Sequence, residues 1–359
     1  MHFALCTTTI NVPVVLDAYA KDFAAHGRRD VRMYVVADLK TPPEAEAYCH
    51  GIQQTYGIEV DYMNVDHQKA YMAAYPELDA HLPYNSVQRR NIGHLKAYEE
   101  GCHTLITIDD DNFPHQADYL AHHAIVGETA AVDVASAADG WYNVCLTLDE
   151  RNGRIFFPRG YPVTKRGENG DASYEPGSTR VAVNAGLWLG DPDVDAVTRL
   201  AAPIDATRYK RDRNVVLAKG TFCPFNSQNT AVAGFSLPAY FMSPHVGRYD
   251  DIWASYLYKY LADHLDWGVT FGSPLVRQDR NVHNLFNDLR LEHMGMQKTE
   301  DFMELITAIT LQGDDFQTAC EHLVEQARTR TSVAEFEQFF AGYALWLTST
   351  RRACTCGGR

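Results

Sequence analysis

The first third of the chain alternates short apolar runs with longer segments in which apolar residues recur at helical spacing. Strands are expected at 3–10, 31–37, 58–65 and 104–108, and helices at 13–26, 44–56 and 91–100. Gly27 and Gly57 directly follow two of these helices, as is common at helix ends. This alternation predicts an α/β fold with a Rossmann-like, mostly parallel sheet flanked by helices.

The remainder of the chain carries a weaker pattern. Residues 141–177 are rich in Gly, Pro, Arg and Tyr, so we expect loops and short irregular strands there. Further strands are expected at 181–189 and 269–271, and an amphipathic helix at 250–265. The pattern from 300 to about 350 is helical. We therefore expect one catalytic domain at 1–297 and a helical C-terminal extension at 298–359.

Composition and charge narrow the class of protein. Hydrophobic residues make up 46% and charged residues 22% of the 359 residues, an ordinary globular balance. The formal net charge of -14 argues against general nucleic-acid binding, because no basic field would attract phosphates. No apolar stretch reaches the length of a membrane span, and the N-terminus lacks the pattern of a signal peptide. The eight cysteines show no paired zinc spacing, so a reduced, cytoplasmic protein is expected.

Three aspartates, Asp109, Asp110 and Asp111, directly follow the apolar run at 104–108. In an open α/β sheet the ends of the strands are where ligands bind. Adjacent like charges repel one another unless a cation or a set of donors compensates them. A hard divalent ion, Mg²⁺ or Mn²⁺, held by these oxygens would in turn hold a diphosphate. The alternative is an acidic helix N-cap, which one aspartate would satisfy better than three.

Two other predicted strands end in polar residues. The first ends in Thr7, Thr8 and Thr9, whose hydroxyls and amides would lie near a nucleotide; ordinary strand propensity of threonine is an equally good explanation. The second ends in Asp38, which would accept hydrogen bonds from a base or ribose. A turn-forming aspartate ahead of proline explains Asp38 equally well.

Basic residues suited to an anionic ligand precede the helix predicted at 91–100. Arg89, Arg90 and Asn91 combine fork-shaped donors with free backbone amides at a helix N-terminus. A solvated basic turn is the alternative. A second basic loop, containing Arg159, would close over phosphates or over a sugar, or would simply be exposed.

Acidic residues later in the chain suggest acid–base chemistry. Asp250 and Asp251 open the helix predicted at 250–265, where they would compensate the helix dipole or act as a base toward an acceptor hydroxyl. Arg280 would contact a phosphate, and His283 would be a third metal ligand. A lone histidine among fifteen is more commonly a surface residue.

These motifs, in this order, resemble a known group of proteins. Residues 107–112 (TIDDDN) resemble the DxD signature of GT-A glycosyltransferases. The chain further resembles the reversibly glycosylated polypeptides, which are plant UDP-arabinopyranose mutases, at 157–162 (FPRGYP), 186–189 (GLWL), 192–196 (PDVDA) and 247–253 (GRYDDIW). The segments 83–86 (PYNS) and 89–93 (RRNIG) are similar to STELLO-type glycosyltransferases. The resemblance runs from about residue 3 to about residue 290 and leaves out the C-terminal helices.

The resemblance implies a GT-A fold, a divalent metal and a uridine-type nucleotide sugar. By the same resemblance Asp109 and Asp111 are metal ligands, Asp110 contacts the sugar, and Arg166 matches an arginine that becomes reversibly glycosylated. Side chains around Asp110, Trp188 and Asp251 would set the sugar specificity, without identifying the sugar.

The sequence therefore predicts a metal-dependent glycosyltransferase that moves a sugar from a UDP-linked donor to an unidentified acceptor. The metal would neutralise the leaving diphosphate, with help from the arginines, and Asp251 or Asp250 would be the base of an inverting reaction. One alternative is a UDP-sugar mutase (pyranose/furanose) that uses Arg166 as a transient carrier. Two others are a non-catalytic nucleotide-sugar-binding subunit and a metal-dependent nucleotide hydrolase. The helices at 300–350 are candidate contact surfaces for a homo-oligomer.

Overall fold

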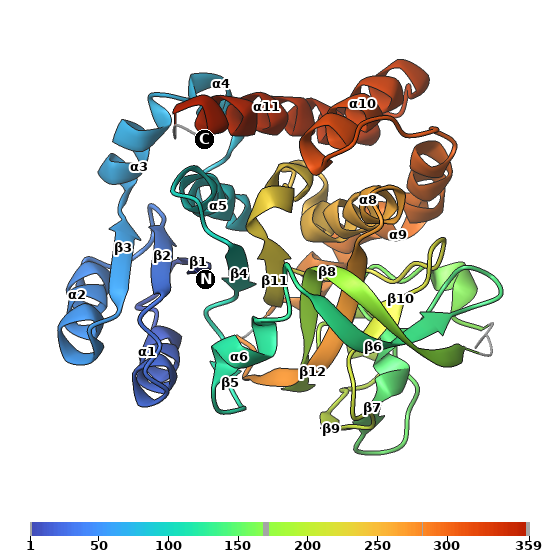
Figure 1. Cartoon of the computed structure of the whole chain (residues 1–359), viewed down its shortest axis with the longest axis horizontal. Helices are drawn as coiled ribbons and strands as arrows, with labels where there is room; N and C mark the ends of the chain where they lie inside the picture. The colour runs from blue at the N-terminus through green and yellow to red at the C-terminus, as the bar shows by residue number, and fades with distance from the viewer. Residues whose placement is uncertain (1, 168–171, 282, 357–359) are drawn as a thin grey trace.

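A computed structural model describes residues 2–167, 172–281 and 283–356 of the chain. These residues build one 12-stranded sheet with the order β3-β2-β1-β4-β11-β8-β6-β10-β12-β5, and helices flank it (Figure 1). β7 and β9 lie off this path and pair with each other. The predicted α/β class, with helices flanking a sheet and a helical C-terminal part, is confirmed.

The first four strands of the predicted pattern are present and parallel to one another. They are β1 (Phe3–Thr9), β2 (Val31–Ala37), β3 (Glu59–Met63) and β4 (Thr104–Ile108). The helices between them are α1 (Val15–Ala25), α2 (Glu44–Tyr56), α3 (Val65–Met72), α4 (Pro76–His81) and α5 (Arg90–Glu99), with the short η1 (Val87–Arg89) leading into α5. Strand order reverses at β1, because β2 pairs with one of its edges and β4 with the other.

Beyond β4 the sheet is mixed, so the prediction of a mostly parallel sheet is correct only for its first part. β11 (Asn229–Ala233) runs antiparallel to both β4 and β8 (Ser173–Gly190). Antiparallel neighbours need no crossover helix, and residues 141–233 supply few helices to make one. The remaining strands are β5 (Asn112–Pro114), β6 (Thr129–Ser136), β7 (Leu148–Glu150), β9 (Ala206–Tyr209), β10 (Val215–Leu217) and β12 (Gly268–Gln278).

Four helices make up most of the C-terminal third of the chain. They are α8 (Asp250–His264), α9 (Leu285–Thr307), α10 (Phe316–Arg330) and α11 (Ala334–Cys356); two short helices, α6 (Tyr119–His123) and α7 (Ala196–Ala201), lie earlier. In Figure 1, α10 and α11 run along one edge of the molecule beside α4, α5 and α8. The predicted division between residues 297 and 298 falls inside α9. Among the described residues, no helix is long and apolar enough to cross a membrane.

An aromatic cluster joins α8 to the C-terminal helices. Trp253 of α8 stacks on Phe302 of α9, with ring centroids 4.8 Å apart, and both side chains are buried. Phe336, Phe339 and Phe340 of α11 surround this pair. The C-terminal helices therefore share the hydrophobic core of the sheet.

Candidate functional site

A cavity of about 540 Å³ opens where β1, β2 and β4 end. It lies at the point where strand order reverses between β1 and β4, the usual ligand position in an open α/β sheet. Nine of the residues predicted from the sequence line it, and they are Thr8, Thr9, Asp38, Arg90, Asp109, Asp110, Asp111, Arg280 and His283. The structure therefore brings together strand ends, a helix start and a distant loop that the sequence presented separately.

Each carboxylate of the acidic triplet has a different environment. Asp109 accepts a charge-assisted hydrogen bond of 2.6 Å from the buried Arg90 guanidinium. Asp110 accepts from the Thr9 hydroxyl at 2.7 Å. Asp111 accepts from the backbone amide of Asn281 through Oδ2, but its buried Oδ1 has no hydrogen-bond partner among the described residues. Burial, reinforced by the charge of Asp109, raises the pKa of Asp111 to about 6.

The unsatisfied oxygen of Asp111 suits a cation with oxygen ligands, because a buried carboxylate without a counter-charge is costly. Asp109 lies beside it and helps raise its pKa, so these two side chains fit the predicted metal-binding role. His283 instead bonds to Asp288 through Nδ1, at 3.1 Å. Among the described residues, no three His, Cys, Asp or Glu side chains converge as a metal site does. The Mn²⁺ or Mg²⁺ cofactor therefore stays a prediction.

Three residues predicted to bind the nucleotide sugar near the start of α5 and in β1 do not line the cavity. The Arg89 guanidinium is wholly buried and donates to Gln68 and to the carbonyl of Leu82. The side-chain amide of Asn91 donates hydrogen bonds to the backbone carbonyls of Gln88 and Met242. Thr7 is buried in β1, with its hydroxyl bonded to the carbonyl of Thr8. Arg89 and Asn91 therefore fix the start of α5, which places the neighbouring Arg90 at the cavity.

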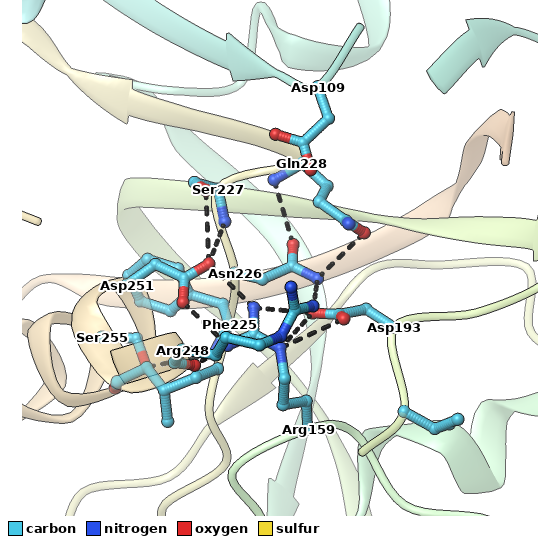
Figure 2. A network of polar contacts seen from close by, with 12 residues as sticks. Asp109, Arg159, Asp193, Phe225, Asn226, Ser227, Gln228, Arg248, Asp251 and Ser255 are labelled. Atoms are coloured by element: carbon cyan, nitrogen blue, oxygen red, sulfur yellow. Dashed lines mark hydrogen bonds and ion pairs between the residues drawn. The ribbon is translucent and has the colours of Figure 1, made fainter. Parts of the chain in front are cut away.

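Arg159 is the centre of a buried ion network (Figure 2). Its guanidinium contacts the carboxylates of Asp193 and Asp251, at 3.0 and 3.1 Å. Asp251 also accepts from the backbone amide and hydroxyl of Ser227, and Asp193 accepts from Asn226. The prediction placed Arg159 on the ligand and Asp251 on an acceptor hydroxyl. In the structure Arg159 and Asp251 instead form an ion pair with each other, because both charged groups are buried and need a partner.

Arg166 and Trp188 also lie outside the cavity lining. Arg166 forms an ion pair with the buried Asp195 and packs against the ring of Phe157. Trp188 is buried in β8 beside a separate, much smaller space of about 20 Å³ that Arg159 also lines. The structure therefore holds these two side chains away from the ligand position that the sequence suggested for them.

Asp250 is buried at the start of α8 and accepts a 2.6 Å hydrogen bond from the side chain of Gln88. Gln88 belongs to η1, next to the cavity-lining Ser86 and Val87. Burial, reinforced by the adjacent carboxylate of Asp251, raises the pKa of Asp250 to about 7. Asp250 therefore contacts Gln88, the sequence neighbour of the cavity-lining Val87, and its pKa allows it to hold a proton near neutral pH.

This raised pKa predicts a dependence of stability on pH. Between the ordinary pKa of aspartate and about 7, the folded protein holds a proton on Asp250 that the unfolded chain releases, so stability falls as pH rises through this window. We expect Asp250→Asn to gain stability relative to the wild type between pH 5 and pH 8. Urea unfolding at these two values measures the difference. Parallel pH profiles of the two proteins would contradict the assignment.

The sequence analysis missed several residues that line the cavity. They are Ile10, Asn11, Asn85, Ser86, Val87, Gln228, Arg248, Gln278 and Asn281. Gln278 lies at the cavity because β12 pairs with β5, the strand that directly follows the aspartates. The register of this pairing sets Gln278 opposite Asn112. Asn85 has a φ of 54°, a conformation that asparagine adopts more readily than most residues, and it is visible only in the folded chain. Arg248 was visible only as part of the motif at 247–253.

A carboxylate cluster behind the fourth strand of a Rossmann-like sheet, at the point of strand reversal, places the chain among the α/β proteins that bind ligands at their strand ends. Within that class, the chain belongs to the reversibly glycosylated polypeptide family, whose model matches residues 49–349. The match includes α10 and most of α11. The expectation that the resemblance stops near residue 290 was therefore wrong.

Two curated relatives of the chain come from plants. UDP-arabinopyranose mutase 3 of Arabidopsis thaliana is 33% identical over 213 residues, which cover 58% of this chain and 55% of the relative. UDP-arabinopyranose mutase 1 of Oryza sativa subsp. japonica is 31% identical over 234 residues, covering 63% and 61%. The chain thus spans little more than half the length of these relatives. Among solved structures, the glucosyl-3-phosphoglycerate synthase of M. tuberculosis aligns over 84% of this chain and 81% of its own, with 10% identity and a TM-score of 0.41.

Proposed function

We propose that the protein is a UDP-sugar mutase, which interconverts the pyranose and furanose forms of a nucleotide-linked sugar. The observation that carries this proposal is membership of the reversibly glycosylated polypeptide family, together with relatives named as UDP-arabinopyranose mutases. Both of these relatives are named as mutases, and neither is named as a transferase. A UDP-linked pentose is therefore the substrate to test first.

The cavity offers the groups that this reaction needs. The interconversion breaks the bond between the anomeric carbon and the diphosphate oxygen, and it also breaks the bond between the anomeric carbon and the ring oxygen. A different hydroxyl then loses its proton and closes the new ring, the former ring oxygen gains a proton, and the bond to the diphosphate is restored, with no net gain or loss of atoms. UDP must therefore stay bound while the sugar rearranges. Asp38 accepts hydrogen bonds at the end of β2, where it already holds the backbone amide of Ser86 at 3.1 Å, and Arg280 lines the cavity close to Asp111.

A divalent cation, if bound as predicted, would be held by Asp109 and Asp111 and would neutralise part of the diphosphate charge. Arg90 already fixes the orientation of the Asp109 carboxylate. The carrier role predicted for Arg166 remains a proposal, and it would require the guanidinium to leave Asp195.

The test is to incubate the full chain with UDP-arabinopyranose in the presence of Mn²⁺ and to separate the products by anion-exchange chromatography. We expect UDP-arabinofuranose to form, and the same mixture to be reached from the furanose side. Asp111→Asn is expected to slow the conversion by on the order of 10²-fold, because it removes a carboxylate ligand of the cation that would neutralise the diphosphate. Release of UDP without any isomerised sugar would contradict the mutase proposal and favour a hydrolase or, with an added acceptor, a transferase.

A further inference from the structure

Two buried acidic residues one turn apart on α9 face the candidate site. Asp288 is 7% exposed and Glu292 is 1% exposed, although both are charged residues on a helix that otherwise presents many polar side chains to solvent. Residues spaced by four lie on the same face of a helix. Buried carboxylates need partners, so their partners indicate what this face of α9 does.

The partners of this acidic pair are an arginine and a histidine that line the cavity. Glu292 accepts a 3.1 Å hydrogen bond from Nε of Arg248. Asp288 lies 3.8 Å from Nη1 of the same guanidinium and bonds to Nδ1 of His283 at 3.1 Å. Glu292 also accepts from the backbone amide of Ala196, at the start of α7. The pair therefore holds Arg248 and His283 from behind, on the side away from the cavity.

The backbone around Arg248 is fixed as firmly as its side chain. Gly247 has a φ of 63°, and a Cβ atom at this position would lie 2.0 Å from the carbonyl oxygen of Leu291 in α9. A Cβ atom on Gly295 of α9 would lie 2.1 Å from the ring of Tyr249. The carbonyl of Arg248 accepts a hydrogen bond from Arg159. Because α9 and 247–249 touch so closely, the guanidinium has a defined position at the cavity wall.

A purely structural ion pair would leave no donors for a ligand, but the contacts of Arg248 leave some. Only Nε makes a hydrogen bond to a described residue, and the side chain is 26% exposed. Arg280 lines the same cavity, and its buried Nε and Nη2 lie 3.4 and 3.6 Å from carboxylate oxygens of Asp191 and Asp193, as ion pairs without a hydrogen bond. Burial, together with repulsion from Arg199 and Arg248, lowers the pKa of Arg280. Two guanidinium groups thus line one cavity, and Arg248 has N–H donors that make no hydrogen bond to a described residue, an arrangement that suits an oxyanion.

We propose that Arg248, together with Arg280, binds the diphosphate of the nucleotide sugar, and that Glu292 and Asp288 of α9 position Arg248 for this contact. The site rests on the proposed function, because it assigns the part of a UDP-sugar that these arginines contact. Asn281 lies next to Arg280 and bonds to Asp111, so the arginines and the acidic triplet face one ligand position. The uridine portion of the ligand lacks the charge that this site recognises.

The test compares ligands with and without the diphosphate by isothermal titration calorimetry on the full chain. UDP, uridine and inorganic pyrophosphate are the three probes. Arg248→Ala is expected to weaken UDP and pyrophosphate by about 10- to 100-fold, the loss of charge-assisted hydrogen bonds, and to leave uridine affinity within about two-fold. Glu292→Gln is expected to weaken UDP less, by about 3- to 10-fold, because it loosens the arginine without removing it. Arg290→Ala, an exposed arginine on the same helix, is the control and is expected to change nothing.

The ratio of UDP affinity to uridine affinity separates ligand contact from simple loss of structure. If Arg248→Ala does not fold, Arg248→Gln retains the length of the side chain and tests the same ratio. An unchanged ratio in a folded variant would overturn the proposal, as would a wild-type protein that binds no UDP. UDP binding that depends on Arg248 without any pyranose–furanose conversion would uphold this site and overturn the mutase function. Pyranose–furanose conversion, with a ratio of UDP to uridine affinity that Arg248→Ala leaves unchanged, would uphold the mutase function and overturn this site.

Discussion

Replacing Arg159 by methionine is expected to lower the free energy of unfolding by about 3–5 kcal/mol at pH 7.5, the usual effect of removing one partner from a buried ion network. The substitution leaves Asp193 and Asp251 facing each other without the guanidinium that lies between them. Both carboxylates are almost fully buried, so water cannot take the place of the lost partner. The methionine stem retains part of the packing, which isolates the electrostatic contribution.

The loss is expected to depend on pH in a defined direction. Burial by itself would raise the pKa of Asp193. The Arg159 guanidinium nevertheless holds this pKa well below its usual range. That contribution to stability is present above the ordinary aspartate pKa and is lost as pH falls through the folded-state value. In Arg159→Met the buried Asp193 carboxylate loses the guanidinium that disfavours its protonation, so the difference from wild type should be smaller at pH 4.5 than at pH 7.5.

Urea unfolding followed by tryptophan fluorescence at the two pH values measures this difference. The control is Arg208→Met, which removes an exposed ion pair with Asp149 and is expected to cost less than about 1 kcal/mol. A loss for Arg159→Met no larger than that of the control would mean that the network contributes little. It would then leave Arg159 open to the ligand-binding role that its motif suggested.

Replacing Phe302 by alanine is expected to cost about 3–5 kcal/mol, as for other buried aromatic side chains. Phe302 is completely buried, stacks on Trp253 and contacts three phenylalanines of α11. Phe286 offers a matched control on the same helix because it is 74% exposed. Phe286→Ala is expected to change stability by no more than about 0.5 kcal/mol.

Differential scanning calorimetry on the two variants distinguishes a shared core from a separate helical extension. If α9 to α11 belong to the core of the sheet, Phe302→Ala should lower the temperature of a single unfolding transition. A second transition that moves alone, while the main one stays in place, would instead support a separate C-terminal domain beginning near residue 298.

Local patterns were sufficient for the first part of the fold. β1, β2 and β4 are apolar runs bounded by polar residues, and this pattern is intrinsic to buried parallel strands. β11 was missed because its five residues, Asn229–Ala233, include two polar ones and lie between loops. The first half of β8 alternates exposed positions and contains Pro176 and Gly177, so it reads as a loop until β6 pairs with it. Both β11 and the first half of β8 therefore form strands because of pairing with strands distant in the sequence.

The same distinction explains which parts of the candidate site were predictable. The aspartates at 109–111 and Arg90 were predicted because each directly follows a strand or begins a helix, so their position depends on local structure. Arg159 and Asp251 satisfy each other across 92 positions of sequence, and nothing near either residue signals that pairing. Glu292 reads as one more charged residue on a surface helix. Its burial depends on the close approach of Gly247, which only the folded chain reveals.

The pairing of β5 with β12 also has a consequence for the order in which the protein assembles. Residues 112–114 find their partners at 276–278, so the strand beside the aspartates stays unpaired until most of the chain has left the ribosome. Contacts between residues so distant in sequence form slowly, because a long loop must close first. The wall of the cavity that carries Gln278 and Arg280 is therefore among the last parts to be completed. A nascent chain ending before β12 would display its acidic triplet with no opposing arginine from 280.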